Sequence, residues 1–150
     1  MNVGAHNPTD ILLSAEKHII TLFFTMRLKI MKMNYFVVGT NNLEASTKFY
    51  DLLFDQTELN QVFSTERMTY WQAGDESFTF AVAIPFDEKI ATNGNGSMVG
   101  FSVGSTKEVQ RLHNKAIELG GTCEGEPNQR GPRFSAYVRD LDQNKLCFFE

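Results

Sequence analysis

The residues best suited to chemistry lie on the two arms of a predicted hairpin at the C-terminal end of the sequence. Side chains alternate along a strand, so Arg133, Ser135 and Tyr137 share one face of the first arm. Cys147 lies on the corresponding face of the second arm. This face therefore carries a hydroxyl, a phenol and a thiol among aromatic side chains, whereas the opposite face is predicted to be core.

Tyr137 is the favoured ligand-binding residue, because a half-buried phenol usually needs a hydrogen-bond partner. Arg133, with Arg130 in the preceding loop, could bind an anionic ligand. A solvated loop charge is an equal alternative for Arg133 and the favoured interpretation for Arg130. A nucleophilic Cys147 would need a neighbouring base or cation to lower its pKa, and no histidine is predicted near it. We therefore favour a small buried hydrophobic role for Cys147.

Four other residues whose side chains could take part in binding or catalysis are weaker candidates. Trp71, the only tryptophan, either stacks on a flat ligand or fills the core, since a short strand does not decide its face. His113 falls on a predicted helix with no second ligand expected beside it, so a structural role is favoured. His6 and His18 lie in the N-terminal extension.

Length and charge limit the possible functions. A chain of 150 residues can bury one good core. Its net charge of -4 gives no basic field for nucleic acid. Two cysteines make no disulfide framework, and no convincing export signal precedes the domain, which together indicate a cytoplasmic protein. We expect a small organic ligand as partner, and neither nucleic acid nor a membrane.

Residues 1–32 are interpreted as an N-terminal extension of doubtful role. The unbroken apolar run at 19–26 is far shorter than the roughly 20 residues of a membrane span. Its basic residues follow the run, unlike those of a secretory signal. Translation starting at Met31 or Met33 is favoured over an amphipathic segment that docks on the domain, a partner or a membrane surface. The domain is therefore expected at 33–150.

Within this domain the sequence predicts a strand, a helix and three strands, and then the same order again. The modules cover about 33–85 and 97–150. Each is too small to bury its own sheet comfortably, so the two should pair, giving an α+β fold. The sheet faces away from the helices would then line a shared concavity containing Tyr35 and Met98. The predicted elements are strands at 34–40, 58–64, 68–73, 77–85, 97–103, 122–125, 133–139 and 145–149, with helices at about 42–55 and 105–119.

Two segments carry a family resemblance. Val38–Tyr50 and Tyr137–Leu146 are similar to the strand-to-helix opening and the closing hairpin of the vicinal oxygen chelate superfamily. This superfamily includes glyoxalase I, bleomycin-resistance proteins, fosfomycin-resistance enzymes and extradiol dioxygenases. Pro85–Asp87 with Gly94–Gly96 resembles a small bacterial subgroup of unassigned activity. The resemblance implies two βαβββ modules that pair into one U-shaped mixed sheet with a central groove and helices on its outer face.

The resemblance also bears on metal binding. Metal-dependent members take four ligands, usually His and Glu, from equivalent strand positions of the two modules. Those positions correspond to Tyr35, about Ala81, Met98 and Cys147, and none is His or Glu. We therefore expect no metal site and no other cofactor; a divalent metal is expected only if this correspondence is wrong.

The sequence thus favours a glyoxalase/bleomycin-resistance-like protein that binds a small organic ligand in the sheet groove. Two alternatives remain: a metal-dependent lyase, isomerase or dioxygenase of the superfamily, and a non-catalytic dimeric scaffold. The sequence is compatible with a homodimer. We assign no catalytic residue. In fosfomycin-resistance relatives the positions of Ser135 and Tyr137 point into the cavity. The predicted ligand-binding residues are Tyr35, Trp71, Met98, Arg133, Ser135, Tyr137 and Cys147.

Overall fold

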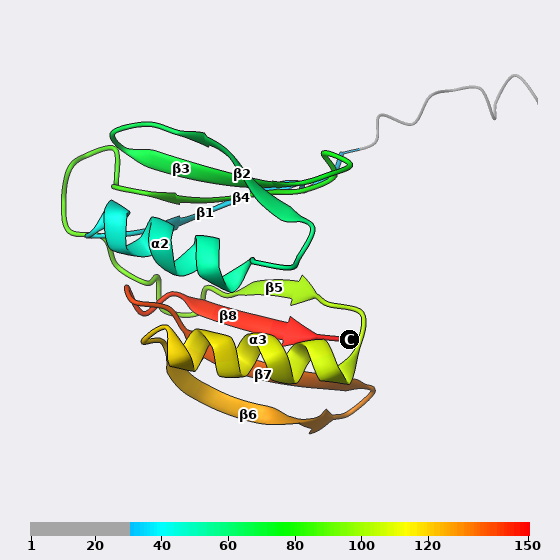
Figure 1. The fold of residues 1–150 in the computed structure, drawn as a ribbon. Coiled ribbons are helices and arrows are strands. Elements are labelled where there is room, and N and C mark those ends of the chain that lie inside the picture. Colours follow the sequence, from blue (N-terminus) through cyan, green and yellow to red (C-terminus); the bar gives the residue numbers. More distant parts are fainter. Residues whose placement is uncertain (1–30) are drawn as a thin grey trace, which may run out of the picture. The chain divides into compact units, whose positions relative to one another are not determined.

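The computed structural model describes residues 31–150, of which Asn34–Glu150 form one compact unit (Figure 1). The predicted extension therefore lies almost wholly outside the described residues. No helix in the described part of the chain is long and apolar enough to cross a membrane. The order strand, helix and three strands occurs twice, which confirms the α+β fold with paired βαβββ modules. The first module contains β1 (Tyr35–Gly39), α2 (Leu43–Leu53), β2 (Leu59–Ser64), β3 (Met68–Ala73) and β4 (Thr79–Ala83). The second contains β5 (Val99–Ser102), α3 (Thr106–Glu118), β6 (Thr122–Arg130), β7 (Arg133–Arg139) and β8 (Lys145–Phe149).

The strands of the two modules follow the same sheet topology. The first sheet has the order β1-β4-β3-β2 and the second has the order β5-β8-β7-β6. In each, the first strand pairs in parallel with the last, and the other neighbours are antiparallel. The described chain therefore holds two four-stranded sheets, with β1 and β5 each at an edge. A continuous U-shaped sheet would need a strand pairing that these residues do not make by themselves.

Each helix begins at a polar residue that caps it. The Oδ1 atom of Asn42 accepts a hydrogen bond of 3.0 Å from the backbone N–H of Ala45, and Ser105 Oγ serves Glu108 in the same way at 3.2 Å. Such caps satisfy backbone donors that have no partner within the helix. α2 packs on the first sheet and α3 on the second, as Figure 1 shows.

The core lies on the helix-covered faces of both sheets. Phe101 of β5 joins the two modules, with its ring centroid 5.6 Å from that of Phe54 and 5.7 Å from that of Phe80. Such aromatic contacts add stability beyond the buried area alone. Five residues of β1, β5 and the segment after β5 belong to the core or pack against it: Phe36, Val38, Val99, Phe101 and Val103.

The turn between β7 and β8 holds the modules together through buried hydrogen bonds. Tyr50 Oη of α2 donates to Asp140 Oδ2 at 2.6 Å. The backbone N–H of Asn144 donates to Asp140 Oδ1 at 2.7 Å, and the Asn144 side chain donates to Gly39 O of β1 at 2.9 Å. Both Tyr50 and Asp140 are buried, so these bonds replace the water that the groups lose on folding.

A second carboxylate in the same turn extends this contact. Asp142 Oδ2 lies 2.6 Å from Thr40 Oγ1 and 2.9 Å from Ser46 Oγ, and both hydroxyls donate to it. Its Oδ1 accepts a bond of 2.9 Å from the backbone N–H of Asn41. The turn of the second module therefore also binds the segment that runs from the end of β1 into α2 in the first module.

Replacing Tyr50 by Phe should test the hydrogen bond from Tyr50 to Asp140. The variant leaves buried Asp140 short of one donor, so we expect its free energy of unfolding to fall by about 1–3 kcal/mol near neutral pH. Burial, and then the charge of Asp140, raises the pKa of Tyr50 well above its ordinary value. A group with a raised folded-state pKa loses its stabilising contribution as the pH rises from its unfolded-state pKa. The difference between the two proteins should therefore shrink above about pH 10.

Urea unfolding of both proteins at several pH values measures this difference. Tyr70→Phe is the matched control, since Tyr70 is only half-buried. A Tyr50→Phe variant as stable as the parent would show that the bond contributes nothing.

Candidate functional site

The face of the second sheet opposite α3, called here the open face, collects most of the predicted site. Tyr137 of β7 pairs with Cys147 of β8, and Ser135 pairs with Phe149. Residues that alternate with the core positions Ala136 and Val138 point away from the helix. Arg133, Ser135, Tyr137 and Cys147 therefore lie together on one surface.

Three cations lie over aromatic rings on this open face. The guanidinium carbon of Arg130 is 5.1 Å from the ring centroid of Tyr137, and Lys145 Nζ is 5.2 Å from the same centroid. The guanidinium carbon of Arg133 is 4.4 Å from the ring centroid of Phe149. Attraction between cation and ring holds each charge in place. The face thus presents fixed positive charge beside a phenol.

Few carboxylates neutralise this charge. Glu124 Oε2 lies 3.5 Å from Lys145 Nζ, but its short contacts are with Arg139. Neither Arg130 nor Arg133 forms a salt bridge with any carboxylate in the described part of the chain. Arg130 is instead held by backbone carbonyls, including that of Glu126 at 3.0 Å. Both arginines therefore keep a charge that an anion could bind.

Cys147 is buried in the middle of this face. Burial raises the pKa of its thiol, and a hydrogen bond with Tyr137 and the nearby cations offset only part of that effect. A protonated thiol is a weak nucleophile. Cys147 is therefore not an activated nucleophile in this structure.

The remaining predicted residues lie at three other places. Met98 is half-exposed just before β5 and shares the strand parity of the open face. Tyr35 lies on the exposed face of the first sheet, where its ring stacks on Tyr70 at 6.2 Å and its hydroxyl donates to Met68 Sδ at 3.6 Å. Trp71 is different, since it is 1% exposed in the core.

The position of Trp71 decides between the two roles considered for it. Its ring lies 5.6 Å from that of Tyr50, and its Nε1 donates to Asp51 Oδ1 at 2.8 Å. Trp71 faces α2 because it pairs with the core residue Phe80 in the neighbouring strand. It therefore fills the core, and the ligand-stacking role predicted for it is corrected.

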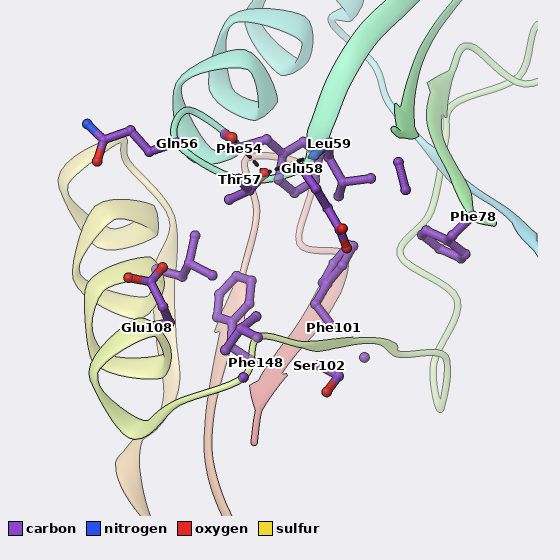
Figure 2. Close-up of a pocket in the computed structure, with 15 residues that line it drawn as sticks. Phe54, Gln56, Thr57, Glu58, Leu59, Phe78, Phe101, Ser102, Glu108 and Phe148 are labelled. Atoms are coloured by element: carbon purple, nitrogen blue, oxygen red, sulfur yellow. Dashed lines mark hydrogen bonds between the residues drawn. The ribbon is translucent and has the colours of Figure 1, made fainter. Parts of the chain in front are cut away.

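A cavity of about 630 Å³ lies where the modules meet, and sequence reasoning missed it. Figure 2 shows aromatic rings along this cavity together with the carboxylates of Glu58 and Glu108. Its shape depends on how the modules pack, which no strand pattern reports. None of the predicted ligand-binding residues lines it. The lining residues are Phe54, Gln56, Thr57, Glu58, Leu59, Ala73, Phe78, Gly100, Phe101, Ser102, Val103, Gly104, Glu108, Leu112 and Phe148.

The sequence analysis also missed the neighbours of His113. Cys123 and Glu126 of β6 offer ligand atoms that lie, with His113 Nε2, within 4.8 Å of one another. The expectation that His113 has no second ligand beside it is therefore wrong. These residues lie on the α3 side of the sheet, away from the open face.

The family model of the Glyoxalase/Bleomycin resistance protein/Dioxygenase superfamily matches residues 32–148. The chain belongs to this superfamily. Among the curated proteins, none matches the chain. The resemblance given by the two sequence segments is thereby confirmed over almost the whole described domain.

Solved structures agree with this assignment. A glyoxalase/bleomycin resistance protein from Albidiferax ferrireducens is 34% identical with a TM-score of 0.71, covering 78% of this chain and 96% of that one. A hypothetical protein from S. aureus is 25% identical with a TM-score of 0.65, covering 85% and 98%. A lactoylglutathione lyase from Agrobacterium tumefaciens shares the fold at 18% identity and a TM-score of 0.61, covering 81% and 95%.

The superfamily's metal positions can now be tested against the structure. Ala81, which pairs with Val37 in β1, is fully buried and has no donor atom. Tyr35 and Met98 offer a phenol and a thioether, and Cys147 a buried thiol. This donor set does not fit a hard or borderline divalent ion, which prefers imidazole and carboxylate ligands. We derive no chemical step through a metal at these positions.

Thiol labelling should separate the two cysteines. With a chelator present, the Cys123→Ser variant, which keeps Cys147, should react with a disulfide reagent more than about tenfold slower than Cys147→Ser. The reason is that Cys147 is buried, whereas Cys123 is exposed. The pKa of both thiols is raised above the ordinary value, so access of the reagent, and not the pKa, distinguishes them. The absorbance of the released reagent gives the rates, and both variants should react alike in denaturant. A fast Cys147 in the folded protein would contradict its assignment as a buried, protonated thiol.

Proposed function

We propose that this protein binds a small organic molecule with an anionic group on the open face of the second sheet. The observation that carries the proposal is the set of cations over Tyr137 and Phe149 on this face. No carboxylate in the described part of the chain forms a salt bridge with Arg130 or Arg133. A guanidinium binds carboxylate or phosphate through paired hydrogen bonds. The partly exposed phenol of Tyr137 would orient the rest of the ligand. Ser135 is only 3% exposed, so its hydroxyl would reach a ligand only if the side chains that cover it move.

In a single described chain, the open face forms only one side of a binding groove. β1 and β5 lie at sheet edges, so each presents backbone N–H and C=O groups without a strand partner. Exposed apolar side chains, including Tyr35 and Val37, lie on β1, and Met98 lies beside β5. We propose that two copies pair at these edges, so that the exposed face of one copy's first sheet closes over the open face of the other's second sheet. Tyr35 and Met98 would then line the same groove as Tyr137.

Both cysteines are free, which supports a reducing, cytoplasmic location.

Ligand binding is tested with matched pairs of small aromatic carboxylic acids and their neutral amides. We expect some acids, and not their amides, to raise the melting temperature, because a bound ligand stabilises the native state by mass action. Binding at 100 times the dissociation constant contributes about 2.7 kcal/mol, which corresponds to roughly 5–10 °C for a chain of this size. Arg133→Gln and Tyr137→Phe should each reduce the shift.

Arg111→Gln is the matched control for the arginine. Arg111 lies on α3, on the other side of the second sheet from the open face, and pairs with Glu108. Equal shifts for acids and amides would refute the anionic ligand. Shifts unaffected by Arg133→Gln and Tyr137→Phe would place binding elsewhere, for example in the cavity between the modules.

Pairing of two copies is tested by placing a charge on the edge of the first sheet. Val37→Asp adds a carboxylate to β1, which should be costly at a buried strand pairing, and we expect the dimer to weaken by more than about tenfold. Val62→Asp is the control, because Val62 lies on β2 at the other edge of the same sheet and is also exposed. Analytical ultracentrifugation over a range of concentrations gives both affinities. A parent protein that stays monomeric at high concentration would reject the pairing.

A further inference from the structure

Three side chains on the α3 side of the second sheet converge on one point. His113 Nε2 lies 3.3 Å from Cys123 Sγ, and Cys123 Sγ lies 3.4 Å from Glu126 Oε1. The other carboxylate oxygen, Glu126 Oε2, lies 4.0 Å from His113 Nε2. An imidazole, a thiol and a carboxylate thus meet at contact distance.

An irregular stretch of β6 makes this meeting possible. In a regular strand, residues three apart point to opposite faces, so Cys123 and Glu126 would be separated. The pairing with β7 shifts register between Cys123 and Gly125 and again between Gly125 and Asn128. These shifts are β-bulges, which redirect side chains. As a result, both Cys123 and Glu126 face α3 and His113.

The spacing of the three atoms suits a tetrahedral ion. Zinc takes Cys at about 2.3 Å, His at about 2.0–2.1 Å and carboxylate oxygen at about 2.0–2.2 Å. At tetrahedral angles, the sulfur atom then lies roughly 3.5–3.7 Å from the nitrogen or oxygen atom, and the nitrogen roughly 3.3–3.5 Å from the oxygen. The two observed distances that involve sulfur, 3.3 and 3.4 Å, are slightly shorter, and a rotation of the exposed Glu126 side chain would bring its oxygen closer to His113.

The imidazole is already oriented for binding. His113 is 2% exposed, so its ring is held by packing. Its Nδ1 lies 3.3 Å from Asn114 Oδ1, which can accept a hydrogen bond from it. A proton on Nδ1 leaves the lone pair of Nε2 directed at Cys123. Metal-ligating histidines are commonly fixed by a second bond of this kind.

We propose that His113, Cys123 and Glu126 bind one Zn²⁺ ion. The soft thiolate and the borderline imidazole favour zinc over magnesium or calcium. Deprotonated Cys123 and Glu126 would carry two negative charges, which match the charge of the ion and outweigh the nearby cation of Arg130. Three protein ligands leave a fourth position to solvent, since Cys123 and Glu126 are exposed. The ion would fasten β6 to α3.

Cobalt substitution in the full chain gives the most specific test. Co²⁺ bound by a thiolate has an intense charge-transfer absorption in the near ultraviolet, whereas ions held only by histidines or carboxylates lack it. We expect this band to saturate at one ion per chain in the parent protein. Cys123→Ser should abolish it, and in competition with a chromophoric chelator should weaken Zn²⁺ binding by more than about 100-fold, since loss of an outer partner alone costs about 10- to 100-fold.

Matched variants identify the ligands. Glu126→Gln should weaken zinc binding, whereas Glu118→Gln should not, because Glu118 lies at the end of α3 and pairs with Lys115. Asn114→Ala should weaken it by about tenfold while keeping the cobalt band. Circular dichroism checks that each variant is folded, and exposed Cys123 is the substitution least able to disturb the core.

Two outcomes would overturn the proposal. A parent protein without the cobalt band would show that no thiolate binds the ion. A band that survives Cys123→Ser but disappears in Cys147→Ser would place the ion at the superfamily's strand positions instead. Zinc bound by His6 or His18 would give no thiolate band, so the extension cannot produce the expected result.

Discussion

The arrangement of the domain depends on the hydrogen bonds that the buried carboxylate of Asp140 accepts. Burial raises its pKa, and the hydrogen bonds from Tyr50 and Asn144 offset part of that effect by favouring the charged form. A buried carboxylate is tolerated only where donors surround it, so the turn has one acceptable position against α2 and β1. Fixing that turn also fixes the end of β7 and the start of β8. The open face is therefore positioned by a contact on the far side of the sheet from it.

This contact explains why so much of the fold could be predicted from sequence. Tyr50 and Asp140 belong to the two segments that carried the family resemblance, and they touch each other in the structure. Strand parity also identified the inward residues, since burial of one face imposes a period of two. β6 was predicted to end at Gly125 but continues to Arg130. Its bulges break the alternation by which a strand is recognised, so that error has a physical cause.

The site was predictable only where its residues share a strand or a neighbouring one. Ser135, Tyr137 and Cys147 were correctly placed on one face of the sheet because parity places them, and the turn sets the register between their strands. The role of Trp71 needed the pairing of β3 with β4, and the neighbours of His113 needed both a bulge and the packing of α3. The cations over Tyr137 and Phe149 likewise depend on side-chain positions that alternation does not report.

The bulge in β6 links the two faces of the second sheet. A Cβ atom at Gly125 would lie 2.9 Å from Tyr137 Cδ2 and 3.1 Å from a terminal nitrogen of Arg130, so a larger residue there would displace the Tyr137 ring or the Arg130 guanidinium. The same irregular stretch turns Cys123 and Glu126 toward His113 on the other face. An ion that fixed the α3 side would thus also restrict the backbone that carries Arg130. The proposed metal site and the proposed anion site share one segment of chain. Occupation of one should therefore change the binding affinity of the other through backbone geometry rather than through charge alone.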